Sequence, residues 1–525
     1  MINTTDLAIN ISKEYSPNMN TDCKIYATPD LQNQILNDKN LITQLTNITK
    51  LPGVTKTVIG LPDLHGGYVL PIGSVTSFNL HDNPIILPGG VGYDINCGVR
   101  CIKTNLSLEE FDIQKALDTV DISPTEISLQ DLNGVLDYGL EFLAKNKIIG
   151  WDNIEYTESG GKYEGCSRNV SQKSKGRGMH QFGSLGCGNH YMEIEYVEKI
   201  FDKELCDVLG LKENQIVISV HSGSRGLGHS VCRDSLVKFN AEVTAFGIGG
   251  YLKVDESVSL NESVYLPADH HLSVDYTRGM SSACNFAFGN RAMISEKVIK
   301  CLKTLYPRLE CELIYDTSHN IAKIENDLDS LIIRKGASRI LEPYNSELPF
   351  KYREIGQPVL VGGSMGTSSY IICGNDCLKT YRSTCHGSGR VIQRKDSKKL
   401  FEHDKIIEDL KSRNIYVKSG SIKGIIEEAP GCYKNIDEVV ECSRLNGITK
   451  TACQMCNHKE MCNNKEMCNH KEICNHKEMC NHKEMCNHKE MCNNKEMCNN
   501  KEMCNHKEMC NNKEMCNNKE MYFGH

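Results

Sequence analysis

The chain has 525 residues, of which 39% are hydrophobic, and it carries a formal net charge of −7 at pH 7. Its first residues form no apolar signal stretch, and no run approaches the ~18 apolar residues that a membrane span needs. The mild charge argues against a surface that binds polyanions over its whole extent but permits a local basic cleft.

Cysteine is abundant, with 27 copies, and eleven of them recur at a six-residue interval from Cys456 to Cys516. The others are scattered through a large chain that has no secretory signal. This distribution is typical of reduced thiols rather than of a disulfide framework. We therefore expect a cytoplasmic protein without a membrane partner, with the nucleus as the alternative compartment.

The first half of the chain alternates between strand-like and helix-like patterns. Residues 24–100 carry short apolar runs between glycine and proline turns, which predicts strands and tight loops. Residues 107–147 show helical periodicity. Residues 150–178 are polar and glycine-rich, which predicts an exposed loop.

The second half mixes the two patterns again. We expect helices at 197–210, 226–243, 277–306 and 435–447, and a buried strand at 215–223 that ends near His221. From Cys311 onward the pattern returns to strands. Asn285, Asn290 and Arg291 are unusual polar insertions in an otherwise apolar helix. Together these elements predict an α+β fold for residues 1–455.

Residues 456–525 repeat the hexapeptide CNHKEM, with Asn in place of His in several copies. Lys and Glu cancel within each repeat, and Met is usually its only large apolar residue. A packed core is therefore not expected, and we interpret the segment as a disordered low-complexity tail. Its Cys and His side chains could also capture soft metal ions.

The run GGVGYDINCGVR contains the strongest candidate for metal chemistry. Asp94 and Cys97 lie three residues apart between glycines, and His190, His221 and His319 occupy similar polar, glycine-rich settings. Such a ligand set suits Mn, Fe, Co or Zn, and a thiolate can bridge two ions. Each histidine alone is more often a hydrogen-bonded core or surface residue, and Cys97 alone a small buried hydrophobe. Five such settings together favour a metal site, because unpaired buried polar groups are costly.

Two further segments suggest phosphate chemistry. The loop GGSMGTSSY at 362–370 offers backbone amides and hydroxyls that could bind a phosphate or a purine edge, although an ordinary turn fits equally well. The segment STCHGSGR at 383–390 places His386 four residues before Arg390. A histidine there could attack phosphorus while the arginine balances phosphate charge, or it could be a solvated surface residue.

Ten ordered motifs resemble the RtcB family of RNA-splicing ligases over residues 25–450. They include PDLHGGYVLPIG, PGGVGYDINCGVR, GSLGCGNHYMEIE, HSGSRGLGH, DTSHNIAK, GQPVLVGGSMGTSSY and STCHGSGR. The spacing is more similar to the eukaryotic and archaeal branch than to the bacterial one. The resemblance implies an RtcB-type fold of mixed strands and helices around a central cleft that binds two metal ions.

The resemblance also implies roles for individual residues. His386 would be the catalytic histidine that accepts GMP from GTP. Two Mn²⁺ ions would bind Asp94, Cys97, His190, His221 and His319, with Cys97 as the bridge. The guanylate would contact the following residues, with Glu193 at the guanine edge: Asn189, His190, Tyr191, Met192, Glu193, Arg225, His319, Asn320, Gly362, Gly363, Ser364, Met365, Ser369, His386, Gly387, Ser388, Gly389 and Arg390. Asp63 and His65 lie in a further family motif without an assigned role.

The implied reaction is GTP-dependent ligation in tRNA splicing. An RNA 2′,3′-cyclic phosphate opens to a 3′-phosphate, takes the guanylate from His386, and is joined to a 5′-hydroxyl end. RNA, in the form of tRNA halves, would be the substrate, and the family also implies an archease-like activator and a multi-subunit ligase complex as partners.

One departure from the family pattern concerns the C-terminus. Family members end in a short strand closing with Lys-Gly, and here CNHKEM repeats stand in its place, so either the pocket lacks that contact or a tail lysine near Lys459 supplies it. Alternative functions are a scaffold that has lost turnover, a metal-buffering tail, and phosphoester hydrolysis at a dimetal centre.

Overall fold

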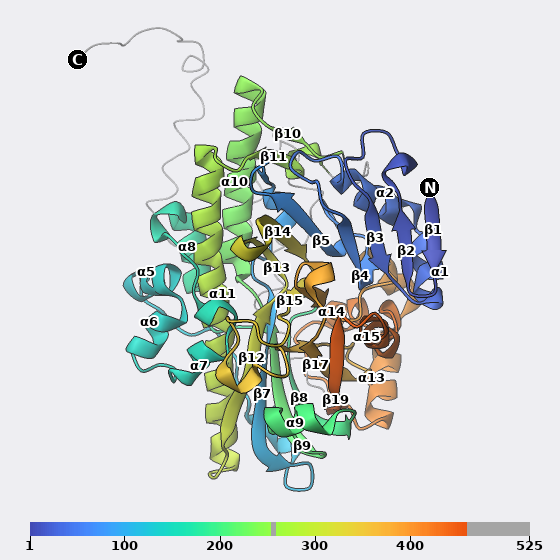
Figure 1. Cartoon of the computed structure of the whole chain (residues 1–525). Helices are drawn as coiled ribbons and strands as arrows, with labels where there is room; N and C mark the ends of the chain where they lie inside the picture. Colours follow the sequence, from blue (N-terminus) through green and yellow to red (C-terminus); the bar gives the residue numbers. More distant parts are fainter. Residues whose placement is uncertain (254–258, 459–525) are drawn as a thin grey trace, which may run out of the picture. The chain divides into compact units, whose positions relative to one another are not determined.

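The computed structural model describes residues 1–253 and 259–458. Helices surround two seven-stranded sheets (Figure 1). This arrangement confirms the predicted α+β class. The repeats from residue 459 onward lie outside the described residues, so the disorder of the tail stays a prediction.

The first sheet, called the N-terminal sheet below, has the order β1-β2-β3-β4-β5-β14-β13. Its strands are β1 (Ile2–Thr5), β2 (Ala8–Ile11), β3 (Cys23–Tyr26), β4 (Val58–His65), β5 (Ile72–Asn79), β14 (Ser330–Lys335) and β13 (Asn320–Glu325). Only β3 and β4 pair in parallel, and a parallel pair requires a crossover connection. Helices α1 (Pro29–Asn37) and α2 (Lys39–Ile48) supply it.

These two helices correct the prediction of strands and loops throughout residues 24–100. Leu31, Ile35, Leu41 and Leu45 are buried at helical spacing. Asp38 accepts a hydrogen bond from the backbone N–H of Leu41 and caps α2. Each of these helices has only nine or ten residues, so its few apolar positions resemble the short apolar runs of strands and turns.

The second sheet, called the central sheet below, has the order β12-β7-β9-β8-β19-β17-β16, and every neighbouring pair is antiparallel. Its strands are β12 (Cys311–Ser318), β7 (Gly98–Ser107), β9 (Gln215–Ser222), β8 (Tyr191–Ile200), β19 (Thr449–His458), β17 (Ser369–Gly374) and β16 (Pro358–Val361). Strand β9 confirms the predicted buried strand that contains His221.

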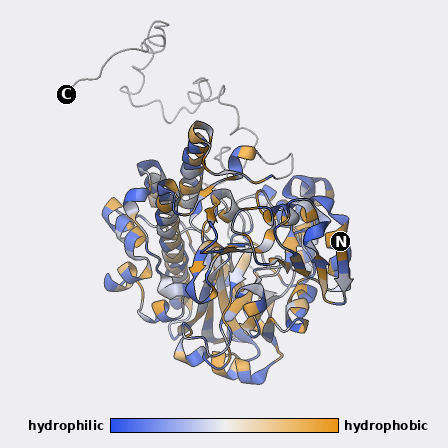
Figure 2. Ribbon diagram, turned by 45° about the horizontal axis from the view of Figure 1, so that its top comes forward, coloured by the Kyte–Doolittle hydropathy of each residue, from blue (hydrophilic) through white to orange (hydrophobic). Residues whose placement is uncertain are grey.

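Side chains of the central sheet alternate between two cores. Ile216 and Ile218 pack with Val298 of the long helix α11 (His271–Leu305), whereas Val217 packs in the core that includes Leu205 of α9 (Lys203–Leu209). Hydrophilic and hydrophobic residues alternate along the outer helices (Figure 2). No helix in the described ranges combines the length and apolar character needed to cross a membrane.

The other elements connect and cover these sheets. The remaining α-helices are α3 (Pro88–Val91), α4 (Ile113–Thr119), α5 (Leu129–Tyr138), α6 (Leu140–Lys145), α7 (Asp152–Glu155), α8 (Gln172–Met179), α10 (Arg225–Phe246), α12 (Arg394–Leu400), α13 (His403–Ser412), α14 (Ile422–Glu427) and α15 (Ile436–Leu445). The small sheets contain β10 (Gly250–Tyr251), β11 (Val264–Pro267), β6 (Ile85–Ile86), β15 (Ala337–Arg339) and β18 (Ser383–Cys385). Helices α10, α11 and α15 confirm the helices predicted at 226–243, 277–306 and 435–447.

The prediction that residues 150–178 form an exposed loop is wrong. The segment contains α7, the 3₁₀ turns Glu158–Gly161 and Ser167–Asn169, and α8. Glu158 and Ser174 are fully buried. Polar composition alone misled the prediction, because the polar groups of this segment have partners elsewhere in the fold.

Two other boundaries differ from the prediction. Val197–Ile200 end strand β8 instead of starting a helix, and α9 begins only at Lys203. Likewise, β7 continues to Ser107, and helix α4 starts six residues later at Ile113. Apolar spacing over so few residues fits a strand and a helix about equally well.

Strand β19 extends three residues past the predicted end of the ligase domain at Met455. Cys456 pairs with Tyr196 of β8 and His458 with Ile194, so residues 456–458, which begin the first repeat, belong to the central sheet. A truncation that tests the tail should therefore keep residues up to His458. The predicted division at 455/456 stays a proposal about where the folded domain ends.

Candidate metal and nucleotide site

Four of the predicted metal residues lie at one edge of the central sheet, where strands β7 and β8 begin and strands β9 and β12 end. Cys97 directly precedes β7 and His190 precedes β8, whereas His221 lies at the end of β9 and His319 follows β12. In the order β12-β7-β9-β8, each strand runs antiparallel to its neighbour. The starts of β7 and β8 therefore lie beside the ends of β9 and β12.

Asp94 reaches the same edge through a tight turn before β7. The backbone N–H of Cys97 donates to Asp94 O at 3.2 Å, and Asn96 adopts a positive φ of 57°. Arg291 of α11 donates to Asn96 O at 2.8 Å. Asn320 donates through Nδ2 to Asp94 O at 3.2 Å. The polar insertion Arg291 thus holds the metal-ligand turn in place.

The donor atoms of these residues converge. Asp94 Oδ2 lies 2.7 Å from His190 Nε2, and Cys97 Sγ lies 3.2 Å from both His190 Nε2 and His221 Nε2. His221 Nε2 and His319 Nε2 are 3.2 Å apart. Five side chains that are far apart in sequence thus meet at one point.

The five residues form two overlapping groups. The first trio is Asp94, Cys97 and His190, the second trio is Cys97, His221 and His319, and within each trio the ligand atoms lie within 4.8 Å of one another. Cys97 is common to both. Carboxylate, thiol and imidazole donors fit a pair of divalent ions of the Mn-to-Zn series.

The electrostatics of the trios favour a bound cation. Burial and neighbouring histidines hold the pKa of His221 and His319 well below its ordinary value, so both rings are neutral with lone pairs available. Burial and Asp94 raise the pKa of the Cys97 thiol. Burial opposes the ionisation of Asp94, but His190, Cys97 and Arg225 together outweigh burial and lower the pKa of that carboxyl. A divalent ion would stabilise the thiolate form of Cys97.

His386 lies directly beside the second trio. Its ring centroid is 4.7 Å from that of His319, and it follows strand β18. Asp63 of β4 is fully buried, and its Oδ2 lies 2.7 Å from His386 Nδ1 and accepts the backbone N–H of His386 at 3.0 Å. Contact at Nδ1 leaves Nε2 as the free ring nitrogen. The sequence motif contained Asp63 but gave no sign of this role.

The backbone around Asp63 is itself anchored. Lys434 donates through Nζ to Pro62 O at 3.1 Å and to Leu64 O at 2.6 Å, and His65 Nδ1 lies 3.0 Å from Asp63 O. Burial lowers the pKa of Lys434 to about 8 and that of His65 to about 3. These contacts fix the carboxylate that orients His386.

Two glycine-rich loops lie next to each other beside His386. Gly362 and Gly387 form a parallel bridge, and the backbone N–H of Gly363 donates to Ser369 Oγ at 3.3 Å. Gly389 has a φ of +74°, and a Cβ there would come within 2.2 Å of Asp63 O. Only glycine permits this approach. The same loops contribute Ser364, Met365 and Ser388, which are all buried.

Strand β8 continues the predicted nucleotide surface. Tyr191 meets the His221 ring edge-on at 5.0 Å, and Glu193 is buried opposite Ser219 of β9. Met192 points to the other face and packs in the core that contains residues of α11. Asn189 is partly exposed in the turn before the strand.

The two predicted arginines, Arg225 and Arg390, lie in different surroundings. Arg225 has a positive φ of 54°, and a Cβ at Gly186 would come within 2.0 Å of its Nη1 and 2.7 Å of His190 Nδ1. Arg390 donates to Glu428 Oε2 at 3.1 Å, Tyr433 OH at 3.0 Å and Glu427 O at 2.6 Å. Arg225 thus lies beside the first trio, whereas Arg390 is bonded within the C-terminal part of the domain.

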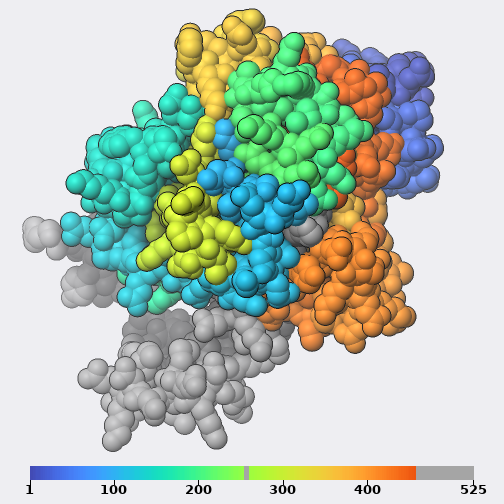
Figure 3. Space-filling view, turned by 90° about the horizontal axis from the view of Figure 1, so that it is seen from below, coloured from blue at the N-terminus to red at the C-terminus, as the bar shows by residue number. Residues whose placement is uncertain are grey.

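A hollow with a volume of about 560 Å³ lies along the same strands, on the face shown in Figure 3. It is lined by residues 103–107, Gly210, Lys212, Glu213, Gln215 and residues 310–312. Because β7 ends and β9 begins here, it lies at the opposite ends of these strands from Cys97 and His221. Its lining mixes Lys103 and Lys212 with three glutamates, and none of the predicted site residues contributes.

Comparison with known proteins gives the family. A family model described as tRNA-splicing ligase RtcB matches residues 44–462, which include every predicted site residue. The chain belongs to the RtcB family. It is 37% identical over 467 residues to the tRNA-splicing ligase RtcB of Thermococcus kodakarensis, covering 84% of this chain and 95% of the relative.

Relatives occur in both archaea and eukaryotes, as the spacing predicted. The tRNA-splicing ligase RtcB of Nanoarchaeum equitans is 38% identical over 458 residues, covering 82% of this chain and 93% of the relative. RNA-splicing ligase RtcB homolog 2 of Entamoeba dispar is 35% identical over 485 residues, covering 85% and 90%.

Proposed function

We propose that this protein is a GTP- and Mn²⁺-dependent RNA ligase of tRNA splicing that joins a 3′-phosphate or 2′,3′-cyclic phosphate end to a 5′-hydroxyl end. One observation carries the proposal: two ligand trios share Cys97, and the ring of His386 lies against His319 of the second trio. Membership of the RtcB family supports the same chemistry.

In this proposal, His386 is the nucleophile. Asp63 accepts at Nδ1, so the proton stays on that nitrogen and the lone pair of Nε2 attacks the α-phosphorus of GTP. An Nε2–P bond forms, the bond to the β-phosphate oxygen breaks, and pyrophosphate leaves. Two divalent ions held by the trios would supply charge neutralisation for the phosphates.

The guanylate then passes to RNA. An oxygen of the RNA 3′-phosphate attacks the His386-linked phosphorus and releases Nε2. The 5′-hydroxyl of the second RNA end attacks the activated 3′-phosphate, a phosphodiester forms, and GMP leaves. The buried Glu193 carboxylate would accept from the guanine edge, which favours GTP over ATP.

Labelling with α-³²P GTP and Mn²⁺ tests the nucleophile. We expect label on the wild-type protein and none on His386→Ala. His180→Ala, which replaces an exposed histidine at the end of α8, is the matched control and should label like wild type. Label retained on His386→Ala would contradict the proposal.

The compartment and partners are part of the proposal. All seventeen cysteines among the described residues are free thiols, which favours a reducing compartment such as the cytoplasm. RNA is the proposed substrate, and an archease-like activator and a ligase complex stay predictions.

A further inference from the structure

The segment after helix α7 extends the central sheet beyond its edge strand β12. The backbone N–H of Asp316 donates to Tyr156 O at 3.0 Å, and Thr157 forms a parallel bridge with Asp316. Thr157 and Glu158 are both buried. A segment whose sequence predicted an exposed loop therefore adds a partial strand at the end of β12.

Glu158 continues this pairing with its side chain. Its Oε2 accepts the backbone N–H of Ser318 at 2.9 Å and the Ser318 hydroxyl at 2.8 Å. The Thr317 hydroxyl donates to the same oxygen at 3.3 Å. The carboxylate thus takes the position that a strand carbonyl would occupy, one residue before the metal ligand His319.

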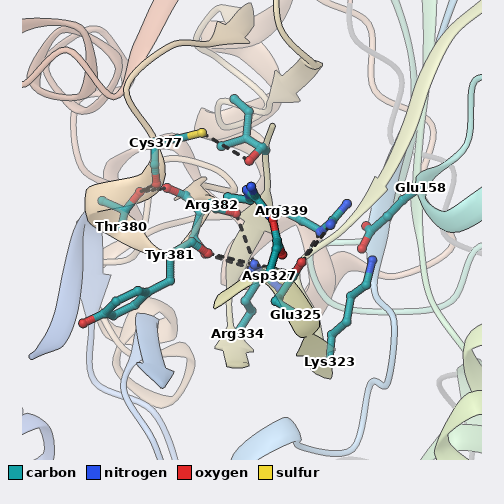
Figure 4. Close-up of polar contacts among 12 residues, drawn as sticks. Glu158, Lys323, Glu325, Asp327, Arg334, Arg339, Cys377, Thr380, Tyr381 and Arg382 are labelled. Carbon is teal, nitrogen blue, oxygen red and sulfur yellow. Dashed lines mark hydrogen bonds and ion pairs between the residues drawn. The ribbon is translucent and has the colours of Figure 1, made fainter. Parts of the chain in front are cut away.

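The carboxylate of Glu158 is ionised although it is buried. Burial would raise its pKa, but Lys323, Arg339 and the Ser318 N–H together hold the pKa of Glu158 below its usual value. Tyr163 donates to the other oxygen at 3.1 Å. Figure 4 shows Glu158 beside Lys323, next to the ion network of Glu325, Arg334 and Arg339.

The position of His319 depends on its backbone more than that of His190 does. His190 Nδ1 lies 3.0 Å from Leu185 O, which orients that ring. His319 Nδ1, in contrast, has no hydrogen-bond partner within residues 1–253 and 259–458. Its backbone N–H donates to Cys97 O at 2.8 Å. The position of the His319 ring is therefore set by how firmly the end of β12 is held.

We propose that Glu158 is a positioning residue for the second trio. Strand β7 fixes one edge of β12 at Ser318, Glu158 fixes the other, and together they aim His319 Nε2 at the site that it shares with Cys97 and His221. The first trio has no contact of this kind with Glu158. The inference rests on the proposed function insofar as both trios bind a divalent ion.

The test is a Mn²⁺ titration of the full chain. Calorimetry measures the heat of binding, and electron paramagnetic resonance measures the free Mn²⁺. Glu158→Asp keeps the charge but shortens the reach, and we expect one ion to bind as in wild type and the second about 10- to 100-fold more weakly. Glu158→Gln keeps the reach with a neutral acceptor, and both affinities should stay close to wild type. The pair of variants separates reach from charge.

Glu325→Asp is the matched control, because it makes the same change at a buried carboxylate of the neighbouring ion network. It should lower Tm and leave both Mn²⁺ affinities unchanged. Two wild-type affinities in Glu158→Asp, or equal losses in Glu158→Asp and Glu325→Asp, would overturn the inference. If Glu158→Asp does not fold, Ser318→Ala replaces it, with a smaller loss at the second ion expected and unchanged binding contradicting the inference.

Failure of the proposed function would look different. Wild-type protein that binds fewer than two Mn²⁺ ions would overturn the dimetal centre itself. Wild-type protein with two ions, and no change in Glu158→Asp, would overturn only the role of Glu158.

Discussion

Two buried polar clusters lie close together in this molecule, and they are balanced in opposite ways. In the ion network, Glu325 accepts from Arg339 Nε at 2.9 Å and Nη2 at 2.8 Å and lies 3.0 Å from Arg334 Nη2. At the sheet edge, neutral histidines face one another and the pKa of the Cys97 thiol is raised. In the first cluster, the carboxylate of Glu325 pairs with the two arginines. The second has lone pairs in excess, and in our proposal divalent cations complete it.

This difference distinguishes buried polar groups that stabilise the fold from buried polar groups that form a binding site. A buried ion pair adds little net stability, because desolvation offsets its attraction, but the loss of one partner is expensive. Convergent lone pairs without a counter-charge cost stability in the absence of a ligand, which is typical of a binding site. We therefore expect a substitution in one cluster to leave the other unaffected.

The largest effect is expected from Cys97→Ala. Because Cys97 belongs to both trios, its loss should weaken Mn²⁺ binding at both positions by more than ~100-fold and abolish guanylate labelling. Cys101→Ala, at a buried non-ligand cysteine of β7, should keep both ions. Retention of one ion at wild-type affinity in Cys97→Ala would mean that the thiol is not shared.

Asp63→Asn should impair His386, the proposed nucleophile, and leave the proposed metal site intact. An amide at this position can present N–H to His386 Nδ1 and favour the wrong tautomer, so the single-turnover rate of labelling should fall about 10²- to 10⁴-fold. Mn²⁺ affinity should not change. A labelling rate close to wild type would show that Asp63 does not orient His386.

Glu325→Ala should damage stability and spare the site. Removing the carboxylate leaves Arg334 and Arg339 buried without it, which should cost about 3–5 kcal/mol in the free energy of unfolding. Denaturant unfolding measures this cost, and Mn²⁺ titration of the folded variant should still give two ions. Loss of an ion would connect the two clusters.

The smallest effect concerns pH. The folded-state pKa of His65, His221 and His319 is lowered from the ordinary value of 6.5, so the unfolded chain binds more protons than the folded chain below that pH. Metal-free protein should therefore lose stability as the pH falls below 6.5. Glu325, whose pKa is lowered from 4.5, contributes stability that is lost only as the pH falls below that value.

Thermal melts of metal-free protein between pH 7.5 and pH 3.5 check this order of events. Glu325→Ala should retain the decline that begins near 6.5 and show a smaller loss below 4.5. A wild-type Tm that stays constant from pH 7 to pH 5 would contradict the neutral, buried state of the histidines.

The sequence predicts elements and candidate residues correctly where a regular apolar pattern and a chemically distinctive residue occur in the same segment. The apolar run QIVISV predicted β9 and placed His221 at its end, and long helical spacing predicted α11. The choice of the five metal residues rested on residue type and setting. Their convergence depends on the antiparallel order β12-β7-β9-β8, which long-range pairing decides and composition does not reveal.

The failures have a common physical cause. Segment 150–178 is polar, yet Glu158 within it is fully buried, because Ser318, Thr317 and Tyr163 satisfy its carboxylate. The motif around Asp63 predicts no role for this residue for the same reason, since its partner His386 is more than 300 residues away. A polar residue in a polar stretch carries no signal of a distant partner, so tertiary contacts are needed to find it.

We propose that one edge of the central sheet binds two divalent ions through a common thiolate beside His386. An anomalous difference map from crystals grown with Mn²⁺ tests it most directly. We expect two peaks, both within bonding distance of Cys97 Sγ, one near His190 and the other near His319. A single peak, or peaks that do not share Cys97, would contradict the account.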